Sequence, residues 1–259
     1  MYDHFHTVPR ASDEMVFEPF TSLSALAAST SRVRLGHIVI CTGFRNPALT
    51  AKMISMLDTI SGGRAELGIG AGWKQEEWEA YGYDVPSTKV RLATLRDHLE
   101  IITRMLEGGD TDRATWSGQY ARVDGAINRP KPIQKPRVPV MVGGNGPDVT
   151  WRLAARHADE INLDGMSPPE VAEALPVIAS RCEEIGRDPA SLKVSVHTWH
   201  GSPGVSDPGQ ARVDLYGAYA ELGVSRVQTY CDGFEDGPEA LASFATDMRA
   251  AGADLESAR

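Results

Sequence analysis

The chain has 259 residues, of which 42% are hydrophobic and 24% are charged, and this length suffices for one large core. Lys and Arg number 26 against 35 Asp and Glu, so the formal net charge of −9 disfavours nucleic acid as a partner. No apolar run approaches the roughly 20 residues that span a bilayer, and the N-terminus lacks the pattern of a signal peptide. Three cysteines without metal-ligand spacing, Cys41, Cys182 and Cys231, fit a reducing cytoplasm and give no support for a metal site.

A strand followed by a helix recurs from Val33 onward. The apolar, β-branched stretch "VRLGHIVICTG" predicts a strand, and "NPALTAKMISMLDTISGG" has helical spacing and ends on two glycines. "RAELGIGAG" precedes the helix "RLATLRDHLEIITRML", and "VPVMVGG", "EINL", "KVSVHTW" and "SRVQTY" are each followed by another helical pattern. Such alternation predicts an α/β fold of parallel strands covered by helices.

One insertion interrupts this alternation at about residues 110–137. The stretch "ATWSGQYARVDGAINRPKPIQKPRVP" has a Ser-Gly turn between two short alternating runs, which predicts a β-hairpin, followed by a proline-rich connector. The prolines favour a stiff, extended strap over a domain boundary. We therefore expect a single domain over residues 1–259.

The carboxyl ends of the predicted strands are where a barrel of alternating strands and helices builds its site. In "VGGNGP", glycines let backbone N–H groups approach an anion, and Pro147 suits the first turn of a helix whose positive end faces that anion. A turn that needs positive φ explains the same glycines equally well. On its residues alone, this turn is ambiguous.

"GIGAGW" is unlike a dinucleotide fingerprint, because Trp73 follows it in place of a helix start. We expect its glycines to let a flat ring lie against the strand, with Trp73 lining a pocket or, alternatively, packing under the loop. His197 and His200 fall on a predicted strand and do not form a metal pair; His200 can face a substrate or serve the structure. No GxSxG elbow supports a hydrolase, and a module that only binds stays open.

Three stretches together carry a family resemblance. In chain order, "YDHFHTVPR", the block from "RVRLGHIVICTG" to "GAGWKQEEWEAYG", and "KPIQKPRVPVMVGGNG" resemble the bacterial luciferase-like superfamily, especially its deazaflavin F420-dependent branch. The resemblance covers most of the chain. It implies a TIM (β/α)8-type barrel whose mouth holds coenzyme F420, or FMN in sister enzymes. We further expect a cytoplasmic homodimer that takes a small-molecule substrate.

The resemblance implies a role for individual residues near the reactive ring. Asp3 would contact the cofactor, and His4 would stand at its reactive face as the catalytic proton donor or acceptor. The bond between Ile38 and Val39 matches a non-prolyl cis peptide that supports the ring in this branch. These four residues form the predicted core of the site.

The other matched cofactor positions follow strand ends, and four of them form the family's phosphate-binding turn: Cys41, Thr42, Ala71, Gly72, and then Gly143, Gly144, Asn145 and Gly146. Trp73 and His200 are the predicted substrate side. Members that oxidise sugar phosphates have Glu where this chain has Trp73, so the acid of their proton relay is missing here.

The resemblance also gives the first residues a place. Family members begin with a strand, a helix and a second strand that closes in Asp-His, which corresponds to Asp3 and His4. We therefore expect a barrel that lacks the first strand, the first helix and most of the second strand, with a poorly anchored stub around Asp3 and His4.

The predicted function is that of an oxidoreductase that transfers a hydride between F420 and a small organic substrate, with His4 available for proton transfer. The alternatives are an FMN-dependent luciferase-like monooxygenase and a degenerate cofactor-binding barrel without catalysis.

Overall fold

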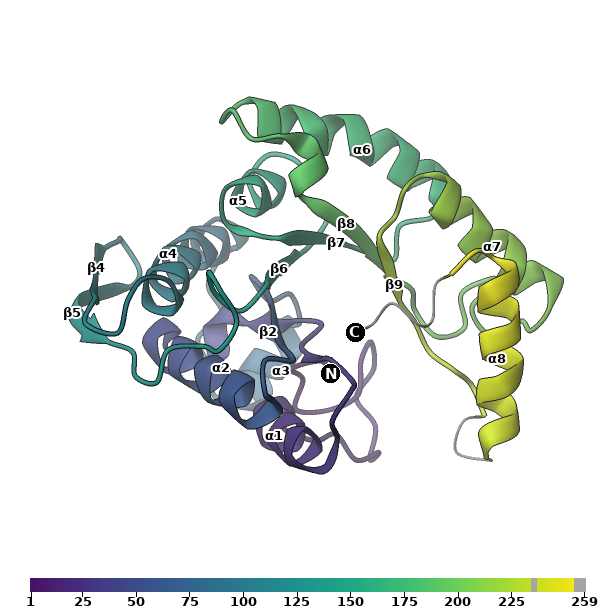
Figure 1. Cartoon of the computed structure of the whole chain (residues 1–259), viewed down its shortest axis with the longest axis horizontal. Helices are drawn as coiled ribbons and strands as arrows, with labels where there is room; N and C mark the ends of the chain where they lie inside the picture. Colours follow the sequence, from purple (N-terminus) through teal and green to yellow (C-terminus); the bar gives the residue numbers. More distant parts are fainter. Residues whose placement is uncertain (234–236, 254–259) are drawn as a thin grey trace. The chain divides into compact units, whose positions relative to one another are not determined.

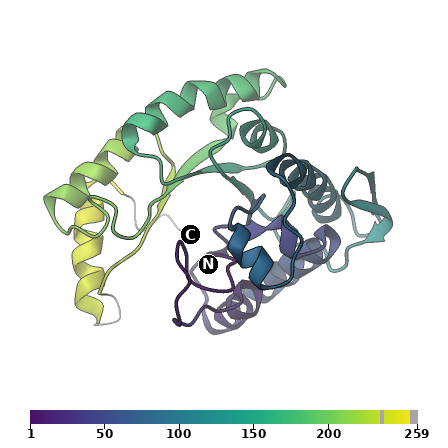
Figure 2. The same cartoon turned by 180° about the vertical axis from the view of Figure 1, so that it is seen from behind.

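The computed structural model describes residues 1–233 and 237–253. The chain divides into two compact units, Met1–Gly143 and Gly144–Arg259. In each unit parallel strands alternate with helices, as the sequence predicts (Figures 1 and 2). The single domain expected over the whole chain stays a prediction. No helix among the described residues is long and apolar enough to cross a membrane.

The first unit is built on a short parallel sheet. Its strands are β1 (Leu35–Gly36), β2 (Ile40–Cys41), β3 (Ala65–Gly70) and β6 (Val140–Gly143). Strand β3 pairs with each of the other three: Leu35 lies opposite Ala65, and Ile40 lies opposite Ile69. Because all pairs are parallel, the carboxyl ends of β2, β3 and β6 meet at one edge of the sheet.

The stretch expected as one strand from Val33 is broken between β1 and β2. The Ile38–Val39 peptide bond in this break is cis, which confirms the expectation from the resemblance. The His37 carbonyl approaches Gly68 so closely that no side chain could stand at that position of β3. The alternation of apolar residues does not reveal such a break, because the residues on both sides remain apolar.

The helices of the first unit are α1 (Pro19–Ser29), α2 (Pro47–Ser61), α3 (Gln75–Ala80) and α4 (Thr88–Leu106), with a 3-10 turn at Thr42–Phe44. Asn46 caps α2, and Gly62 ends it in the left-handed region at φ 68°, as the two glycines predict. Leu95, Leu99 and Ile102 of α4 are fully buried, whereas Leu92 on the same helix is half-buried. The sequence analysis missed α1 and α3.

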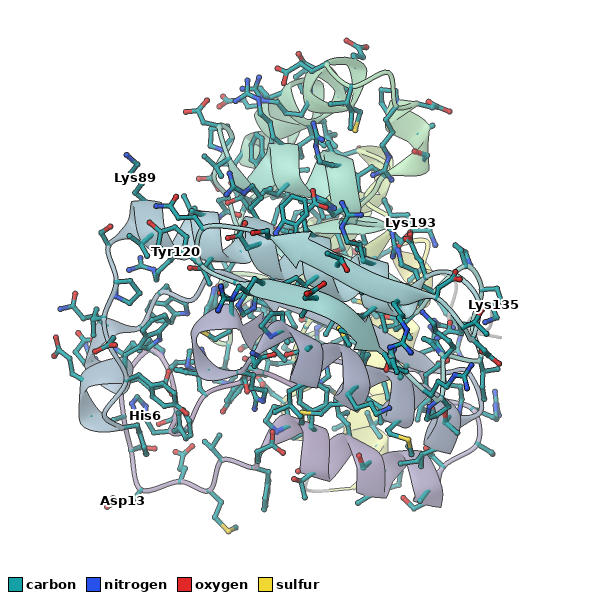
Figure 3. The ribbon with its side chains drawn as sticks, turned by 90° about the vertical axis from the view of Figure 1, so that its left-hand side faces the viewer. His6, Asp13, Lys89, Tyr120, Lys135 and Lys193 are labelled. Carbon is teal, nitrogen blue, oxygen red and sulfur yellow. The ribbon has the colours of Figure 1, made fainter. Side chains whose placement is uncertain are left out.

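The predicted hairpin is present, with β4 (Arg113–Ser117) antiparallel to β5 (Arg122–Ile127). The backbone N–H of Tyr120, at its turn (Figure 3), donates to the buried carboxylate of Asp97 at 2.8 Å. In the proline-rich strap that follows, Lys131 is 8% exposed, and its Nζ donates to the Met105 carbonyl at the end of α4. The strap therefore packs on the first unit.

Residues 1–18 contain no strand, although the sequence analysis expected the end of one there. The Met1 amino group donates to the Gly36 carbonyl at 2.8 Å, and the Met1 carbonyl accepts from the Ile38 N–H at 2.8 Å. The expectation of a poorly anchored stub is wrong, because these bonds and those of Asp3 and Phe5 described below hold it. Beyond them the chain forms a loop whose exposed Asp13 lies at its outer edge (Figure 3).

The second unit repeats the alternation with three parallel strands, β7 (Glu160–Asp164), β8 (Lys193–His197) and β9 (Arg226–Gln228), and β8 lies between the other two. Its helices are α5 (Thr150–His157), α6 (Pro168–Glu183), α7 (Gln210–Glu221) and α8 (Pro238–Ala250), with a 3-10 turn at Pro189–Ser191. Helices α7 and α8 pack side by side (Figure 1). Helix α5 begins at Thr150, because residues 147–149 form a turn, and not at Pro147 as expected.

Candidate active site

The first unit gathers several predicted site residues at the carboxyl ends of its strands. Strand β2 ends at Cys41, β3 at Gly70 and β6 at Gly143, and these strands are neighbours in the sheet. The side chain of Val39, just after the cis bond, packs into the space above two of these ends. A Cβ atom at Gly70 would lie 2.9 Å from Val39 Cγ2, and one at Gly143 would lie 3.0 Å from Val39 Cγ1.

The glycines of "GIGAG" make room for protein atoms. The Cβ position of Gly68 is occupied by the His37 carbonyl, and a Cβ at Gly72, where φ is 77°, would lie 2.5 Å from Cys41 Sγ. The expectation that these glycines admit a flat ring therefore does not hold on the face where their side chains would stand. What Ala71 and Gly72 can offer a cofactor is their backbone.

Asp3 anchors the end of β2. Its Oδ2 accepts from the Cys41 N–H at 2.9 Å and from the Arg45 guanidinium at 2.7 Å, and Arg45 also donates to Glu18 at 2.9 Å. Burial raises the pKa of Asp3, although Arg45 acts in the opposite direction. Burial also raises the pKa of the Cys41 thiol to about 12, so this thiol stays protonated and is no nucleophile. Thr42 is buried beside it.

His4 is held by a carboxylate that the sequence analysis missed. Its Nδ1 lies 2.7 Å from Oε2 of Glu77, and the other oxygen of Glu77 accepts from the Phe5 N–H at 2.6 Å. The Glu77 side chain is 1% exposed, whereas that of His4 is 16% exposed. The rings of Tyr2 and Trp73 stand 5.6 and 5.8 Å from the imidazole. This segment lies beside α3, which carries Glu77 (Figures 1 and 2).

Glu77 belongs to "KQEEWEA", where an acidic run normally indicates a solvated face. Trp78, the next residue, is the sequence signal that could have revealed Glu77, because a tryptophan in a short acidic helix marks a buried face. Glu77 is buried with Trp78, while the Glu76 side chain is 75% exposed. Trp78 packs under the strand ends, in the space that a Cβ at Gly72 would need. Trp73 is 53% exposed, and its place on the substrate side stays a prediction.

From Gly144 on, the glycine turn belongs to the second unit. Gly144, at φ 133°, donates its N–H to the Asn162 carbonyl at 3.0 Å. The Asn145 side chain donates to the Asp164 carbonyl at 2.8 Å and accepts from the Asp164 N–H at 2.9 Å. The Gly144 N–H is therefore engaged by β7 and is not available to a phosphate, and the Asn145 side chain is held on β7 by one N–H of its amide and by its oxygen.

Three other backbone donors of the turn bear on the predicted phosphate contact. The backbone N–H groups of Asn145, Gly146 and Asp148 donate to no acceptor within residues 1–233 and 237–253. The Asp148 carboxylate, 84% exposed, opposes an anion here, but it lies 3.6 Å from Arg181 and 3.9 Å from Arg152. Binding of a phosphate by this turn stays a prediction, and these backbone N–H groups would be its donors.

The histidines at and after the end of β8 form their own pairs. His197 Nδ1 lies 2.9 Å from Oδ1 of Asp164, and His200 Nε2 lies 3.2 Å from Oδ1 of Asp232. The His200 side chain is 66% exposed, and its predicted contact with substrate stays a prediction. No group of three metal-ligating side chains occurs in the described part of the chain.

Two curated proteins are similar in sequence to this chain. The 5,10-methylenetetrahydromethanopterin reductase of Methanopyrus kandleri is 30% identical over 187 residues, which are 68% of this chain and 52% of that protein. The F420-dependent glucose-6-phosphate dehydrogenase of Kineococcus radiotolerans is 35% identical over 162 residues, which are 61% of this chain and 44% of that protein. The chain thus spans about half the length of the curated relatives it matches.

Solved structures agree on the fold. An F420-dependent secondary alcohol dehydrogenase in complex with an F420-acetone adduct matches with a TM-score of 0.68 and 24% identity, covering 85% of this chain and 64% of that one. The coenzyme F420-dependent tetrahydromethanopterin reductase of Methanopyrus kandleri matches with a TM-score of 0.61 and 22% identity, covering 92% and 72%. The predicted α/β class and luciferase-like barrel type are thereby confirmed. The model of the luciferase-like monooxygenase family matches residues 2–253, and the chain belongs to that family.

Proposed function

We propose that the chain is an F420-dependent oxidoreductase that exchanges a hydride between this cofactor and a small organic substrate. The observation that carries the proposal is the His4–Glu77 pair at the strand ends of a luciferase-like chain. An imidazole with one nitrogen on a buried carboxylate and its ring partly exposed is suited to proton transfer. The F420-dependent relatives named above support the choice of cofactor.

The side chains at these strand ends would present no unpaired acid to a flat ring. Both nearby acids are compensated: Asp3 is paired with Arg45, and Glu77 accepts from His4 and Phe5. What remains is apolar or neutral, namely Val39, the protonated thiol of Cys41 and the ring of Trp73. Val39, Cys41 and the backbone of Ala71 and Gly72 would hold the ring, and Asp3 would contact it through Oδ1, since Oδ2 makes both of its hydrogen bonds.

When bound, F420 accepts or returns a hydride at its C5 atom. If an alcohol is oxidised, the carbon loses a hydride with its two electrons and the hydroxyl loses a proton. His4 takes that proton at Nε2, because Nδ1 is engaged with Glu77. In the reverse direction the same nitrogen donates the proton to the carbonyl oxygen.

Trp73 argues against a sugar phosphate as the substrate. Its ring stands 5.8 Å from His4 at the position that carries an acid in sugar-phosphate-oxidising enzymes. An indole offers an apolar face and one N–H donor, and no base. We therefore expect small substrates with an apolar part next to the reacting hydroxyl or carbonyl group.

The test is a pair of titrations, with F420 and with FMN, followed by cofactor fluorescence. We expect F420 to bind at least about tenfold more tightly, a difference of about 1.4 kcal/mol. A panel of small secondary alcohols, with glucose 6-phosphate as the contrasting substrate, is then assayed by the loss of oxidised F420. Preference for FMN would replace the proposal by a monooxygenase. Binding of a cofactor without turnover of any substrate in the panel would replace it by the cofactor-binding barrel without catalysis, and binding of neither cofactor would overturn the proposal.

A further inference from the structure

Glu77 makes two hydrogen bonds that a carboxylate can make only as an acceptor. Oε1 accepts from the Phe5 N–H at 2.6 Å, and Oε2 lies 2.7 Å from His4 Nδ1. Since the Glu77 carboxylate brings no proton of its own, the proton in the second bond resides on Nδ1 of His4. The neutral imidazole then has its lone pair on Nε2.

The position of Glu77 is itself fixed by packing. Glu77 lies in α3, next to Trp78, which is 4% exposed. The indole of Trp78 fills the space where Gly43 and Gly72 have no side chain. A carboxylate on this helix therefore cannot follow His4 if the ring turns, and the ring must adapt to the carboxylate.

We infer that Glu77 is a positioning residue that fixes His4 in the tautomer protonated at Nδ1 and so presents Nε2 as the proton acceptor. The role in catalysis rests on the proposed function, whereas the tautomer is a property of the chain alone. Glu77 touches no substrate in this account and acts only through His4.

One substitution tests this role, because Glu77→Gln keeps the size of the side chain and replaces one acceptor oxygen by a donor NH2 group. In Glu77→Gln the amide oxygen can still accept from the Phe5 N–H, which leaves the amide NH2 facing His4 Nδ1. An NH2 group must donate, so Nδ1 becomes the acceptor and the ring proton moves to Nε2. Both hydrogen bonds should survive, and the nitrogen that should accept the substrate proton becomes a donor.

The first measurement is the tautomer of His4 by 15N–1H correlation spectroscopy of the chain without cofactor, with the signals assigned by their loss in His4→Gln. We expect the Nδ1-protonated form in the wild type and the Nε2-protonated form in Glu77→Gln. The matched control is Glu76→Gln, which removes the same charge from the same helix at a side chain that is 75% exposed. The control should keep the wild-type tautomer.

The second measurement is turnover with F420 and a substrate found in the alcohol panel. Glu77→Gln should lower kcat about 10²-fold or more and change KM less than about threefold, since general base catalysis contributes about 10² to 10⁴. Glu77→Asp keeps an acceptor and should keep the wild-type tautomer with part of the rate. Glu76→Gln should turn over like the wild type.

The outcomes separate two failures. An Nε2-protonated ring in the wild type, or an unchanged ring in Glu77→Gln, overturns the positioning role whatever the activity. A switched tautomer with undiminished kcat overturns its part in catalysis. If the tautomers behave as expected while no chain binds F420, the proposed function fails and the fixing of the ring by Glu77 stands. If Glu77→Gln does not fold, the wild-type and Glu77→Asp spectra still decide the tautomer.

Discussion

Each unit contains a histidine bonded through Nδ1 to a carboxylate, and the two pairs differ in burial. His4 and Glu77 lie 2.7 Å apart with the carboxylate 1% exposed, while His197 and Asp164 lie 2.9 Å apart with the carboxylate 48% exposed. Water competes with His197 for hydrogen bonds to the exposed carboxylate of Asp164 and has little access to the buried carboxylate of Glu77. Distance alone therefore does not identify a catalytic pair, because a carboxylate orients an imidazole only if it is itself held in place.

The largest expected difference between the pairs is in turnover. His4→Ala should reduce kcat by about 10² to 10⁴, the usual contribution of a general acid or base, while the dissociation constant of F420 changes little. His197→Ala should change kcat less than about threefold. Steady-state assays with the same substrate measure both. Equal losses in the two variants would abolish the distinction between the pairs.

The first unit should lose stability in acid through two buried histidines. Burial lowers the pKa of His37 to about 3 and that of His98 to about 4, and both lie in the first unit. These folded pKa values lie below the unfolded value of about 6.5, so the stabilisation is complete above pH 6.5 and is lost as pH falls toward the folded values. Each histidine should cost about 1.4 kcal/mol per pH unit in that window.

Hydrogen exchange of β3 amides between pH 7.5 and 5 measures this loss, after correction for the intrinsic exchange rate. His98→Gln should remove about half of the pH-dependent loss. The matched control is His200→Gln, because the His200 side chain is 66% exposed. A pH dependence of equal size in wild type and His98→Gln would assign the loss to other groups.

Removing an arginine should separate the units again. Arg45→Ala leaves the carboxylate of Asp3, 4% exposed, without its cation, and breaking a buried pair in this way costs about 3 kcal/mol. Arg152→Ala removes a 44% exposed guanidinium from Glu184, and the free energy of unfolding should stay unchanged within error. Urea unfolding compares the two variants. Equal stability of both would contradict the anchoring role of Asp3.

The smallest expected effect concerns the glycine turn of the second unit. Asp148→Asn removes an exposed carboxylate beside free backbone donors and should tighten F420 binding about two- to fivefold at low salt, less at high salt. Substitution of Gly144 would be a poorer test, because its φ of 133° strains any other residue. Glu173→Gln, an exposed change of the same charge, is the control. Equal affinities at low salt would remove the phosphate assignment.

The sequence predicts the alternation of strands and helices well, because periodicity and end signals such as Asn46 and Gly62 act locally. It misses the break between β1 and β2, since apolar residues continue through it. It also misses Glu77 and Arg45, whose partners are 73 and 42 residues away along the chain. Contacts of that kind follow from how the elements pack, and no local pattern encodes them.

The close packing at Gly68, Gly70 and Gly72 limits how this chain could be re-engineered. A methyl group at any of these positions would collide with His37, Val39 or Cys41, so a library randomised there would return misfolded variants rather than new specificities. Trp73, 53% exposed and adjacent to the His4 ring, carries no such restriction. Close relatives of this chain that differ in substrate preference should therefore differ in the residue at position 73 and keep the three glycines before it.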